Sequence, residues 1–125
     1  MIKQKKTLED ILDYKFKDKR LLEKALTHKS FSSNNNEKLE FLGDRVLGLV
    51  ISKKLLEKFP NENEGIIDKK FANLVNKSTC TDIAKKMNLK SYLFLGASHK
   101  NLESFANKIV SDTLEAIVGA IYLDG

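Results

Sequence analysis

Apolar residues recur along the chain at helical spacing, and polar or charged residues fill the positions between them. Thr7 is placed to open a short helix, and Asp18 to cap KRLLEKALTH, whose apolar residues fall three and four positions apart. A third helix is predicted from Asn36 to about Phe59, because Pro60 cannot continue it. The pattern indicates a chain built from helices.

The second half of the chain continues in the same way. After an acidic loop, Asp68 is predicted to cap one helix, and Ser78 or Thr79 to cap the next. One or two further helices are predicted within residues 101–125. Because no alternating run is bounded by hairpin turns, the sequence predicts an all-α fold.

The third predicted helix separates into two faces of different chemistry. With about 100° per residue, Glu37, Glu40 and Asp44 share one narrow face. An apolar stripe lies on the other side of the same helix: Leu39, Leu42, Val46 and Val50. Phe41 and Gly48 lie among the acids, where a solvated face rarely has either. We therefore expect a contact with a partner subunit at Phe41 and the close approach of another backbone at Gly48.

The last predicted helix also carries acids beside a glycine. Asp112 and Glu115 lie one turn apart, Gly119 follows one turn later on the same face, and most other residues there are apolar. Carboxylates in apolar surroundings are costly unless they are paired or coordinated. We expect a cationic group to meet them.

Two such helices, packed with their acidic faces together, would pool four carboxylates. Each pair of like charges about 4 Å apart would repel by roughly 4 kcal/mol at an effective dielectric near 20, and a divalent cation would remove that penalty. Oxygen ligands suit Mg²⁺ or Mn²⁺, and the lack of paired His and Cys argues against zinc. The alternative is that these acids are ordinary solvated surface residues, since spacing does not show whether the helices meet.

Composition adds limits rather than a function. A chain of 125 residues with 42% hydrophobic and 31% charged residues is typical of one globular domain. No apolar run is long enough for a membrane span or a signal core, so we expect a cytoplasmic protein without a membrane partner. The single cysteine, Cys80, cannot form an internal disulfide, and the net charge of +5 permits an anionic partner such as nucleic acid.

Four ordered blocks of the sequence resemble one known family. The segment NEKLEFLGDRVL is similar to the signature of the ribonuclease III family, although Arg45 stands where a small residue is usual. Three further blocks also match the family: YKFKDKRLLEKALTHKSF, EGIIDKKFANLVN and SDTLEAIVGAIYLDG. The resemblance implies an all-α, dimeric endonuclease domain that cleaves double-stranded RNA with Mg²⁺, for which Mn²⁺ can substitute. The implied products carry 5′-phosphate and 3′-hydroxyl ends.

The resemblance also implies roles for individual acids. Glu40, Asp112 and Glu115 match the family's metal ligands, while Asp44 and Glu115 match its catalytic pair. Glu37 matches a further acid that helps to place RNA or to arrange the dimer. The division of roles among the four principal carboxylates stays open, as does the number of metal ions.

Other matching residues are expected to support the site. Glu64 matches another acid that helps to place RNA or to arrange the dimer, and Phe41 lies on the family's subunit interface. Lys108 lies one turn before Asp112, so we expect it to contact a phosphate or to pair with that acid. His28, in ALTHKS, is interpreted as a hydrogen-bonded structural residue rather than a general base.

For domain organisation, we expect residues 1–125 to form one catalytic domain without a double-stranded-RNA-binding domain. The signature is more like that of the long bacterial enzymes, which favours a shortened long form over a natural short form. The expected biological role is the processing of ribosomal and messenger RNA precursors. A catalytically silent RNA-binding or assembly domain of the same fold is the main alternative. A di-iron carboxylate protein would require Glu-x-x-His pairs, which the sequence lacks.

Overall fold

The computed structural model describes residues 7–97 and 103–125, with side chains from residue 106 onward in the second range. Its elements follow in chain order: α1 (Leu8–Leu12), α2 (Lys19–Ala25), α3 (Glu37–Lys58), α4 (Glu64–Leu74), α5 (Lys77–Lys86), the 3₁₀ helix η1 (Leu89–Tyr92) and α6 (Glu103–Asp124). Thr27 and Phe94 form an isolated bridge, and the described ranges contain no strand. The predicted all-α class is confirmed.

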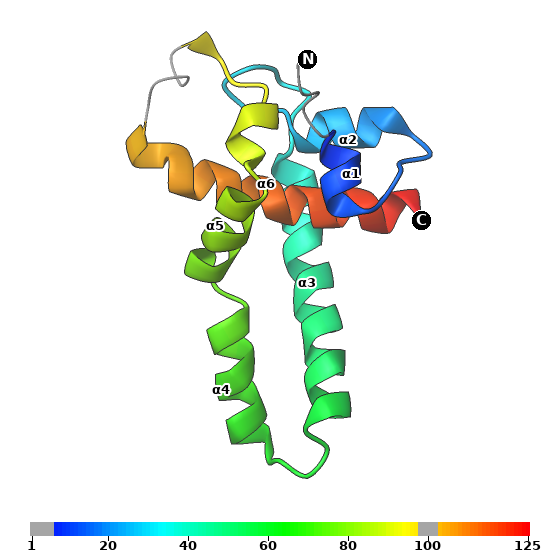
Figure 1. Ribbon diagram of the computed structural model, residues 1–125, viewed down its shortest axis with the longest axis vertical. Coiled ribbons are helices and arrows are strands. Elements are labelled where there is room, and N and C mark those ends of the chain that lie inside the picture. Colours follow the sequence, from blue (N-terminus) through cyan, green and yellow to red (C-terminus); the bar gives the residue numbers. More distant parts are fainter. Residues whose placement is uncertain (1–6, 98–102) are drawn as a thin grey trace, which may run out of the picture.

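Helix α6 lies at the centre of the fold, and α2, α3, α5 and η1 pack against it (Figure 1). Residues 109–117 of α6 are all buried. Helices α3 and α4 form a long antiparallel hairpin that projects away from the rest of the molecule, and the start of α3 crosses α6. The contact between α3 and α6 is the most extensive between any two elements.

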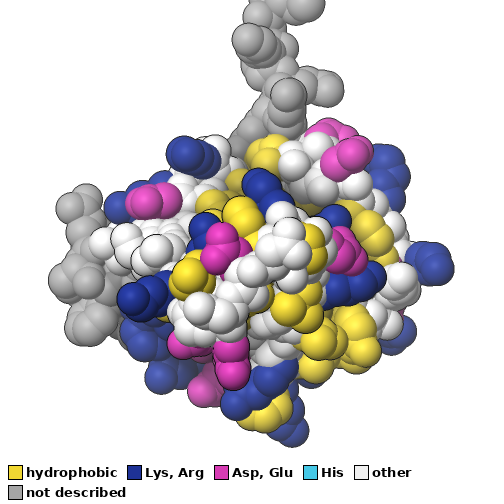
Figure 2. Space-filling view, turned by 90° about the horizontal axis from the view of Figure 1, so that it is seen from below, with side chains coloured by type: hydrophobic (Ala, Val, Ile, Leu, Met, Phe, Trp, Pro, Cys, Tyr) yellow, Lys and Arg dark blue, Asp and Glu magenta, His cyan; other side chains and the backbone are white. Residues whose placement is uncertain are grey.

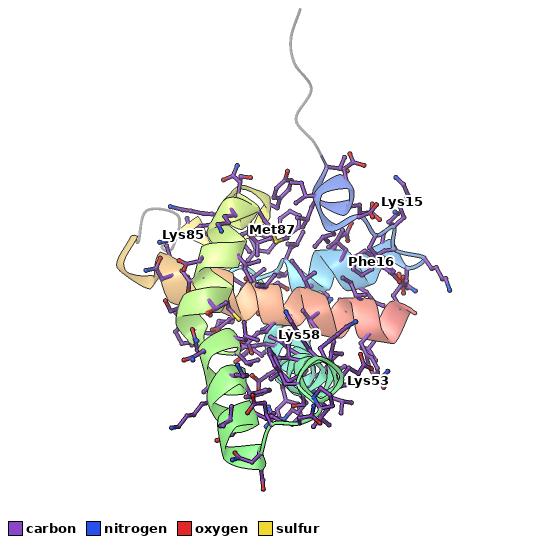
Figure 3. All side chains as sticks on the ribbon, turned by 60° about the horizontal axis from the view of Figure 1, so that its bottom comes forward. Lys15, Phe16, Lys53, Lys58, Lys85 and Met87 are labelled. Atoms are coloured by element: carbon purple, nitrogen blue, oxygen red, sulfur yellow. The ribbon has the colours of Figure 1, made fainter. Side chains whose placement is uncertain are left out.

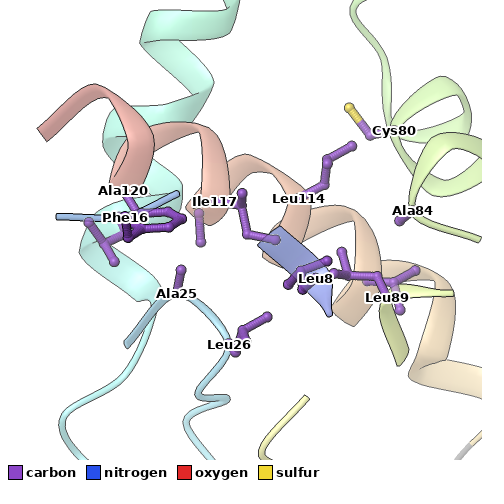
Figure 4. Packing of buried hydrophobic residues seen from close by; sticks show 13 residues of the cluster. Leu8, Phe16, Ala25, Leu26, Cys80, Ala84, Leu89, Leu114, Ile117 and Ala120 are labelled. Atoms are coloured by element: carbon purple, nitrogen blue, oxygen red, sulfur yellow. The ribbon is translucent and has the colours of Figure 1, made fainter. Parts of the chain in front are cut away.

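The hydrophobic core gathers on the side of α6 away from the hairpin (Figure 4). Ile117 and Ala120 of α6 contact a cluster to which the N-terminal helices contribute Leu8, Phe16 and Ala25. On α5 and η1, the cluster continues with Cys80, Ala84 and Leu89. Each of these side chains is almost fully buried. The core therefore packs against α6 along much of its length. A different face of α6 contacts α3.

Two glycines allow α3 and α6 to cross with their backbones in contact. A Cβ on Gly43 would overlap the carbonyl oxygen of Glu115, and a Cβ on Gly119 would overlap that of Leu39. The expectation that Gly48 would be the point of close approach is wrong, because a Cβ there would meet only the Phe71 ring at 3.6 Å. The crossing lies one turn closer to the start of α3 because α6 packs there.

The apolar stripe predicted for α3 is only partly buried for the same reason. Leu39 is 4% exposed, whereas Val50 is 49% exposed. Helix α6 covers only the beginning of α3, so farther along the hairpin some apolar side chains, such as Leu55, are still buried while others are open to solvent. Leu49 and Leu56 are likewise exposed.

The cap residues predicted from the sequence are the observed ones at α1 and α2, but other residues cap α4 and α5. Thr7 forms a capping box with Asp10, and the Asp18 side chain accepts a hydrogen bond from the Arg20 backbone N–H at 3.0 Å. Helix α4, however, begins before Asp68 and is capped by Asn63, which accepts from Ile66 N–H at 3.0 Å. In α5, Asn76 is the cap rather than Ser78 or Thr79. Asparagine is as good a cap as the residues expected, and pattern alone did not rank the candidates.

Within the described residues, every helix is too short or too polar to cross a lipid bilayer.

We predict that Gly43→Ala destabilises the protein by about 2 kcal/mol or more, because the new methyl group meets backbone atoms that cannot move aside. The matched control is Gly48→Ala on the same helix. There the methyl group has room, so the higher helix propensity of alanine is expected to leave stability unchanged or raise it by up to about 1 kcal/mol. Urea unfolding followed by circular dichroism measures both. Equal unfolding midpoints for the two variants would contradict the close crossing.

Candidate active site

The start of α3 is anchored to the end of α2. The backbone N–H of Asn36 donates to the Thr27 carbonyl at 3.0 Å, and its side-chain amide donates to the Ala25 carbonyl at 3.1 Å. Asn36 is 4% exposed, so both bonds are shielded from water. This anchor fixes the direction in which α3 leaves the core and thereby the position of Glu40.

Three carboxylates meet where α3 crosses α6. Glu40 is half-buried, whereas the side chains of Asp112 and Glu115 are only 12% and 6% exposed. Burial, followed by the negative charge of Asp112, raises the pKa of Glu40 above its ordinary value. The negative charge of Glu115 contributes in the same direction, so the three acids lie within electrostatic range of one another.

Two lysines neutralise the buried pair of acids. The Lys77 ammonium donates to Asp112 Oδ1 at 2.8 Å and to Glu115 Oε1 at 2.6 Å. Lys108 donates to the other Asp112 oxygen, Oδ2, at 2.6 Å. Of the two roles predicted for Lys108, the structure shows the pairing with Asp112. The expected cationic group near the α6 acids is thus supplied by the chain itself.

The pKa values of the two buried acids move in opposite directions. Burial alone would raise the pKa of Asp112, but hydrogen bonds from Lys108 and Lys77 outweigh it, so this pKa is lowered. For Glu115, burial outweighs the hydrogen bond from Lys77 and raises the pKa, and the negative charge of Asp44 adds to the increase. The pKa of Lys77 is raised because its two carboxylate partners outweigh the effect of its own burial.

Asp44 lies at the exposed edge of the acidic cluster. Its side chain is 55% exposed and pairs with Arg45 at 3.3 Å. The Arg45 guanidinium also lies 3.9 Å from the centre of the Phe41 ring, which is itself 61% exposed. A large apolar ring held in solvent beside the acids agrees with the unusual position of Phe41 on the helical wheel.

A cavity of about 330 Å³ opens beside the acids. Glu37, Glu40 and Asp112 lie on its walls together with His28, Lys29, Asn36, Lys108 and Ile109. His28 is a hydrogen-bonded residue, as expected, because its Nδ1 accepts from the Ser30 backbone N–H at 3.1 Å and lies 2.7 Å from Ser30 Oγ. The structure therefore places Glu37 near Glu40 at a cavity open to solvent.

Glu64 lies apart from the other predicted site residues. It is the first residue of α4 and is exposed near the tip of the hairpin, whereas Glu40 is in the first turn of α3 at the opposite end (Figure 1). A helix rises about 1.5 Å per residue, so the length of α3 separates the two acids within one chain. Any part that Glu64 has in the site requires a second copy of the chain.

Sequence reasoning missed Lys77. The sequence does contain a signal for it, because Lys77 is the first residue of α5, where the helix dipole disfavours a positive charge. A lysine at that end of a helix needs a compensating partner. Its partners, Asp112 and Glu115, lie 35 and 38 positions away in the sequence, so only the fold identifies them.

The acids provide the right atoms for a hard divalent cation. All donors are carboxylate oxygens, which Mg²⁺ and Mn²⁺ prefer. Asp112 and Glu115 already bind cationic nitrogen, which shows that both accept a positive charge at the crossing. In the arrangement described for residues 7–97 and 103–125, no three acidic or His and Cys side chains converge closely enough to coordinate one ion. The two lysines hold the Asp112 and Glu115 carboxylates in this arrangement.

In its described residues the chain is an all-helical domain in which Asp112 and Glu115 of α6 are buried beside the half-buried Glu40 of α3. The model of the family described as ribonuclease-III-like matches residues 18–125. The chain therefore belongs to the ribonuclease III family. This agrees with the resemblance found in the four sequence blocks.

Individual relatives give the same result. Ribonuclease 3 of Pelagibacter ubique is 60% identical over 119 residues, which cover 94% of this chain and 53% of that protein. Ribonuclease 3 of Sulfurovum is 47% identical over the same length and is covered to the same extent. The chain thus spans about half the length of the curated relatives it matches.

A solved structure shows the same fold. The nuclease domain of ribonuclease III from Campylobacter jejuni has a TM-score of 0.90 and 48% identity, covering 94% of this chain and 84% of that one. Its description refers to structural flexibility in a region involved in dimer formation. The fold of the chain is therefore that of a ribonuclease III nuclease domain.

We predict opposite stability effects for two amide substitutions in metal-free protein at pH 7. Glu40→Gln should raise the melting temperature, because a raised carboxyl pKa means that the folded state disfavours the charge. Asp112→Asn should lower it by a few degrees, because the lowered pKa reports a charge stabilised by two lysines.

The pH dependence of these two effects is also predicted. The penalty at Glu40 exists above its raised pKa and disappears below about 4.5, while the gain at Asp112 exists above about 3.8 and is lost as pH falls through its lowered pKa. Thermal melts in EDTA between pH 3 and pH 8 measure both. Effects of the same sign at pH 7 would contradict this electrostatic description.

Proposed function

We propose that the chain is the catalytic domain of a Mg²⁺-dependent endoribonuclease that hydrolyses phosphodiester bonds in double-stranded RNA. The observation that carries the proposal is the acidic cluster at the α3–α6 crossing, with Asp112 and Glu115 buried and Glu40 half-buried, in a member of the ribonuclease III family. The products are 5′-phosphate and 3′-hydroxyl ends, and the natural substrates are precursors of ribosomal and messenger RNA.

Within this proposal, Glu40, Asp112 and Glu115 hold the metal. When bound, Mg²⁺ would stabilise negative charge on the phosphate and on the leaving 3′ oxygen and would lower the pKa of the attacking water. The protein's own contribution is position, since both α6 carboxylates are buried on a helix that the core holds rigidly. Rigid placement matters because a misplacement of about 1 Å can reduce the rate by about 10²-fold.

Asp44 and Glu115 are proposed as the catalytic pair that orients and deprotonates water. Asp44 is exposed beside the buried acids, so its carboxylate is accessible to water and substrate. Glu115 is buried, and burial raises the pKa of its carboxyl group in the metal-free protein. The exposed Asp44 carboxylate is placed to accept a proton from water, while Glu115 would keep its oxygens for the metal.

Recognition of RNA is proposed to depend on charge and shape. Lys29 and Lys108 line the cavity beside Glu37 and Glu40, so positive charge flanks the acids where a phosphate would approach. A-form RNA is bound mainly through its phosphates and 2′-hydroxyls, and phosphate contacts make affinity salt-dependent. Glu37 keeps its proposed supporting role at the rim of this cavity.

A homodimer is proposed to complete the site. The face seen from the tip of the hairpin has apolar side chains open to solvent among the charged ones (Figure 2). The exposed apolar residues of α3 include Phe41 at 61% and Leu49 at 73%. An apolar cavity of about 380 Å³ lies nearby on α3 and α6, lined by Val46, Val118, Ile121, Tyr122 and Gly125.

These two features are complementary. In a two-fold symmetric dimer, a ring that protrudes from one chain inserts into a recess of its partner, and the partner's ring inserts into the first chain in the same way. Phe41 supplies the ring, and the cavity at Val46 supplies an apolar recess on the same helix. The Campylobacter nuclease domain has a region that is involved in dimer formation, which supports this assembly. In such a dimer, Glu64 of the second copy could lie near Glu40, Asp112 and Glu115 of the first.

We predict that the purified chain cleaves long duplex RNA in Mg²⁺ at low salt and does not cleave it in EDTA. Glu115→Gln should reduce the cleavage rate by at least about 10³-fold, because it removes a proposed metal ligand and proton acceptor. Denaturing gel electrophoresis of end-labelled duplexes measures the rate and the chemistry of the new ends.

The matched control for this prediction is Glu57→Gln, which removes an exposed α3 carboxylate paired with Lys53 at 3.6 Å. It should cleave at the wild-type rate. Duplex binding without cleavage at any Mg²⁺ concentration would reject the enzyme proposal and favour a catalytically silent RNA-binding domain.

We predict that the protein sediments at micromolar concentration with twice the 14.2 kDa mass of one chain. Phe41→Ala should raise the dimer dissociation constant by about tenfold or more, because a central aromatic side chain typically carries much of an interface's affinity. Phe31→Ala is the control, because Phe31 is also a 57% exposed phenylalanine but packs on Phe94 instead. A wild-type chain that stays monomeric would overturn the proposed interface.

A further inference from the structure

One lysine occupies the centre of the acidic cluster. The Lys77 ammonium lies 2.8 Å from Asp112 Oδ1 and 2.6 Å from Glu115 Oε1, so a single group binds the two most buried carboxylates of the site. The Lys77 side chain is 60% exposed overall, whereas its partners are 12% and 6% exposed. The stem of the lysine is therefore in solvent while its charged end reaches into the protein.

Lys77 lies at a position in α5 where a positive charge is unfavourable. The ion pairs with Asp112 and Glu115 offset this cost. As the first helical residue, Lys77 places positive charge at the positive end of the helix dipole. Two carboxylates, both nearly buried, compensate for this. Lys108 differs, because within the described part of the chain its one ion pair is with Asp112, from one turn earlier on the same helix.

The lysines and a metal ion would compete for the same two carboxylates. Lys77 and Lys108 together use both oxygens of Asp112, and Lys77 uses one oxygen of Glu115. A divalent cation held by Asp112 and Glu115 would also lie next to the Lys77 ammonium, where like charges repel strongly because little water separates them. The metal and the ammonium are therefore alternatives.

We propose that Lys77 is a resident counter-ion of the active site, which neutralises Asp112 and Glu115 in the metal-free protein and must leave them before a divalent cation can bind. This inference rests on the proposed metal-dependent function and adds a step to it. Lys77 is a positioning residue in the metal-free state and a competitor of the metal.

A cavity next to the cluster can hold the Lys77 side chain after it leaves the two acids. A cavity of about 530 Å³ adjoins the cluster between α5 and α6, and Lys77 lies on its wall with Ser78, Lys85 and Ser111. The Ser111 hydroxyl is fully buried and has no hydrogen-bond partner within the described part of the chain. The 60% exposure of Lys77 also means that its stem can move without disturbing the core.

The test is metal binding without RNA. Isothermal titration calorimetry of metal-free wild type and Lys77→Met with Mn²⁺ measures affinity directly, and methionine preserves an unbranched stem without the charge. If Lys77 competes with the metal, the variant should bind Mn²⁺ about tenfold more tightly, within the range typical of coupling between two ligands. Its melting temperature in EDTA should fall below that of wild type, and the difference should shrink or reverse with saturating Mn²⁺.

Two further variants separate charge from packing. Lys85→Met removes another lysine of α5 from the wall of the same cavity (Figure 3), and the described residues give it no ion pair with either acid. It should bind Mn²⁺ with wild-type affinity. Lys77→Arg retains the positive charge and should also stay near wild type. If Lys77→Met is too unstable to titrate, Lys77→Gln takes its place in the same comparison.

The outcomes distinguish the two proposals. Unchanged or weaker Mn²⁺ binding by Lys77→Met or Lys77→Gln, with measurable wild-type binding, would overturn the counter-ion role and leave the metal-dependent function intact. Absence of Mn²⁺ binding by wild type and by every variant would overturn the metal-dependent function and the counter-ion role together.

Discussion

The contact between the backbones of α3 and α6 is the constraint on which the rest of the structure depends. Gly43 and Gly119 let the two helices approach until the peptide groups of one touch those of the other. Side chains beside such a crossing have little room to turn toward water. Glu40 on α3 and Asp112 and Glu115 on α6 are consequently held close together at the crossing, and the two α6 acids are buried. The packing that stabilises the fold therefore also brings negatively charged carboxylates close together, where they repel one another.

Two lysines of the chain form ion pairs with the buried carboxylates and so reduce this repulsion. An unpaired buried carboxylate costs several kcal/mol, and removing one partner of a buried ion pair is strongly destabilising. Lys77 and Lys108 supply the charge that the acids lack, at hydrogen-bonding distance. These ion pairs therefore offset the cost of burying the two carboxylates. The opposite pKa shifts of Asp112 and Glu115 show that the compensation is uneven, because among the described residues Asp112 has two lysine partners and Glu115 has one.

Much of this architecture could be predicted from sequence, and the errors have physical causes. The wheel placed Glu40 and Asp44 together because helical geometry is local, and Pro60 marked the end of α3 correctly within about two residues. Gly48 was chosen over Gly43 as the close contact because a wheel contains no information about where along its length a helix is crossed. Likewise, Val50 belongs to the apolar stripe by spacing but lies beyond the part of α3 that α6 covers.

The sequence by itself determined the helical class and the grouping of acids on two helices, because these follow from residue type and from spacing within single elements, and it indicated the family through the resemblance of four blocks. Only the tertiary structure decided which residues meet. Lys77 lies on α5 and binds acids on α6, and Glu64 lies at the far end of the hairpin from Glu40 although both belong to family blocks. Such relations depend on where helices cross and in which direction they run. Periodicity fixes neither of these, because it describes one helix at a time.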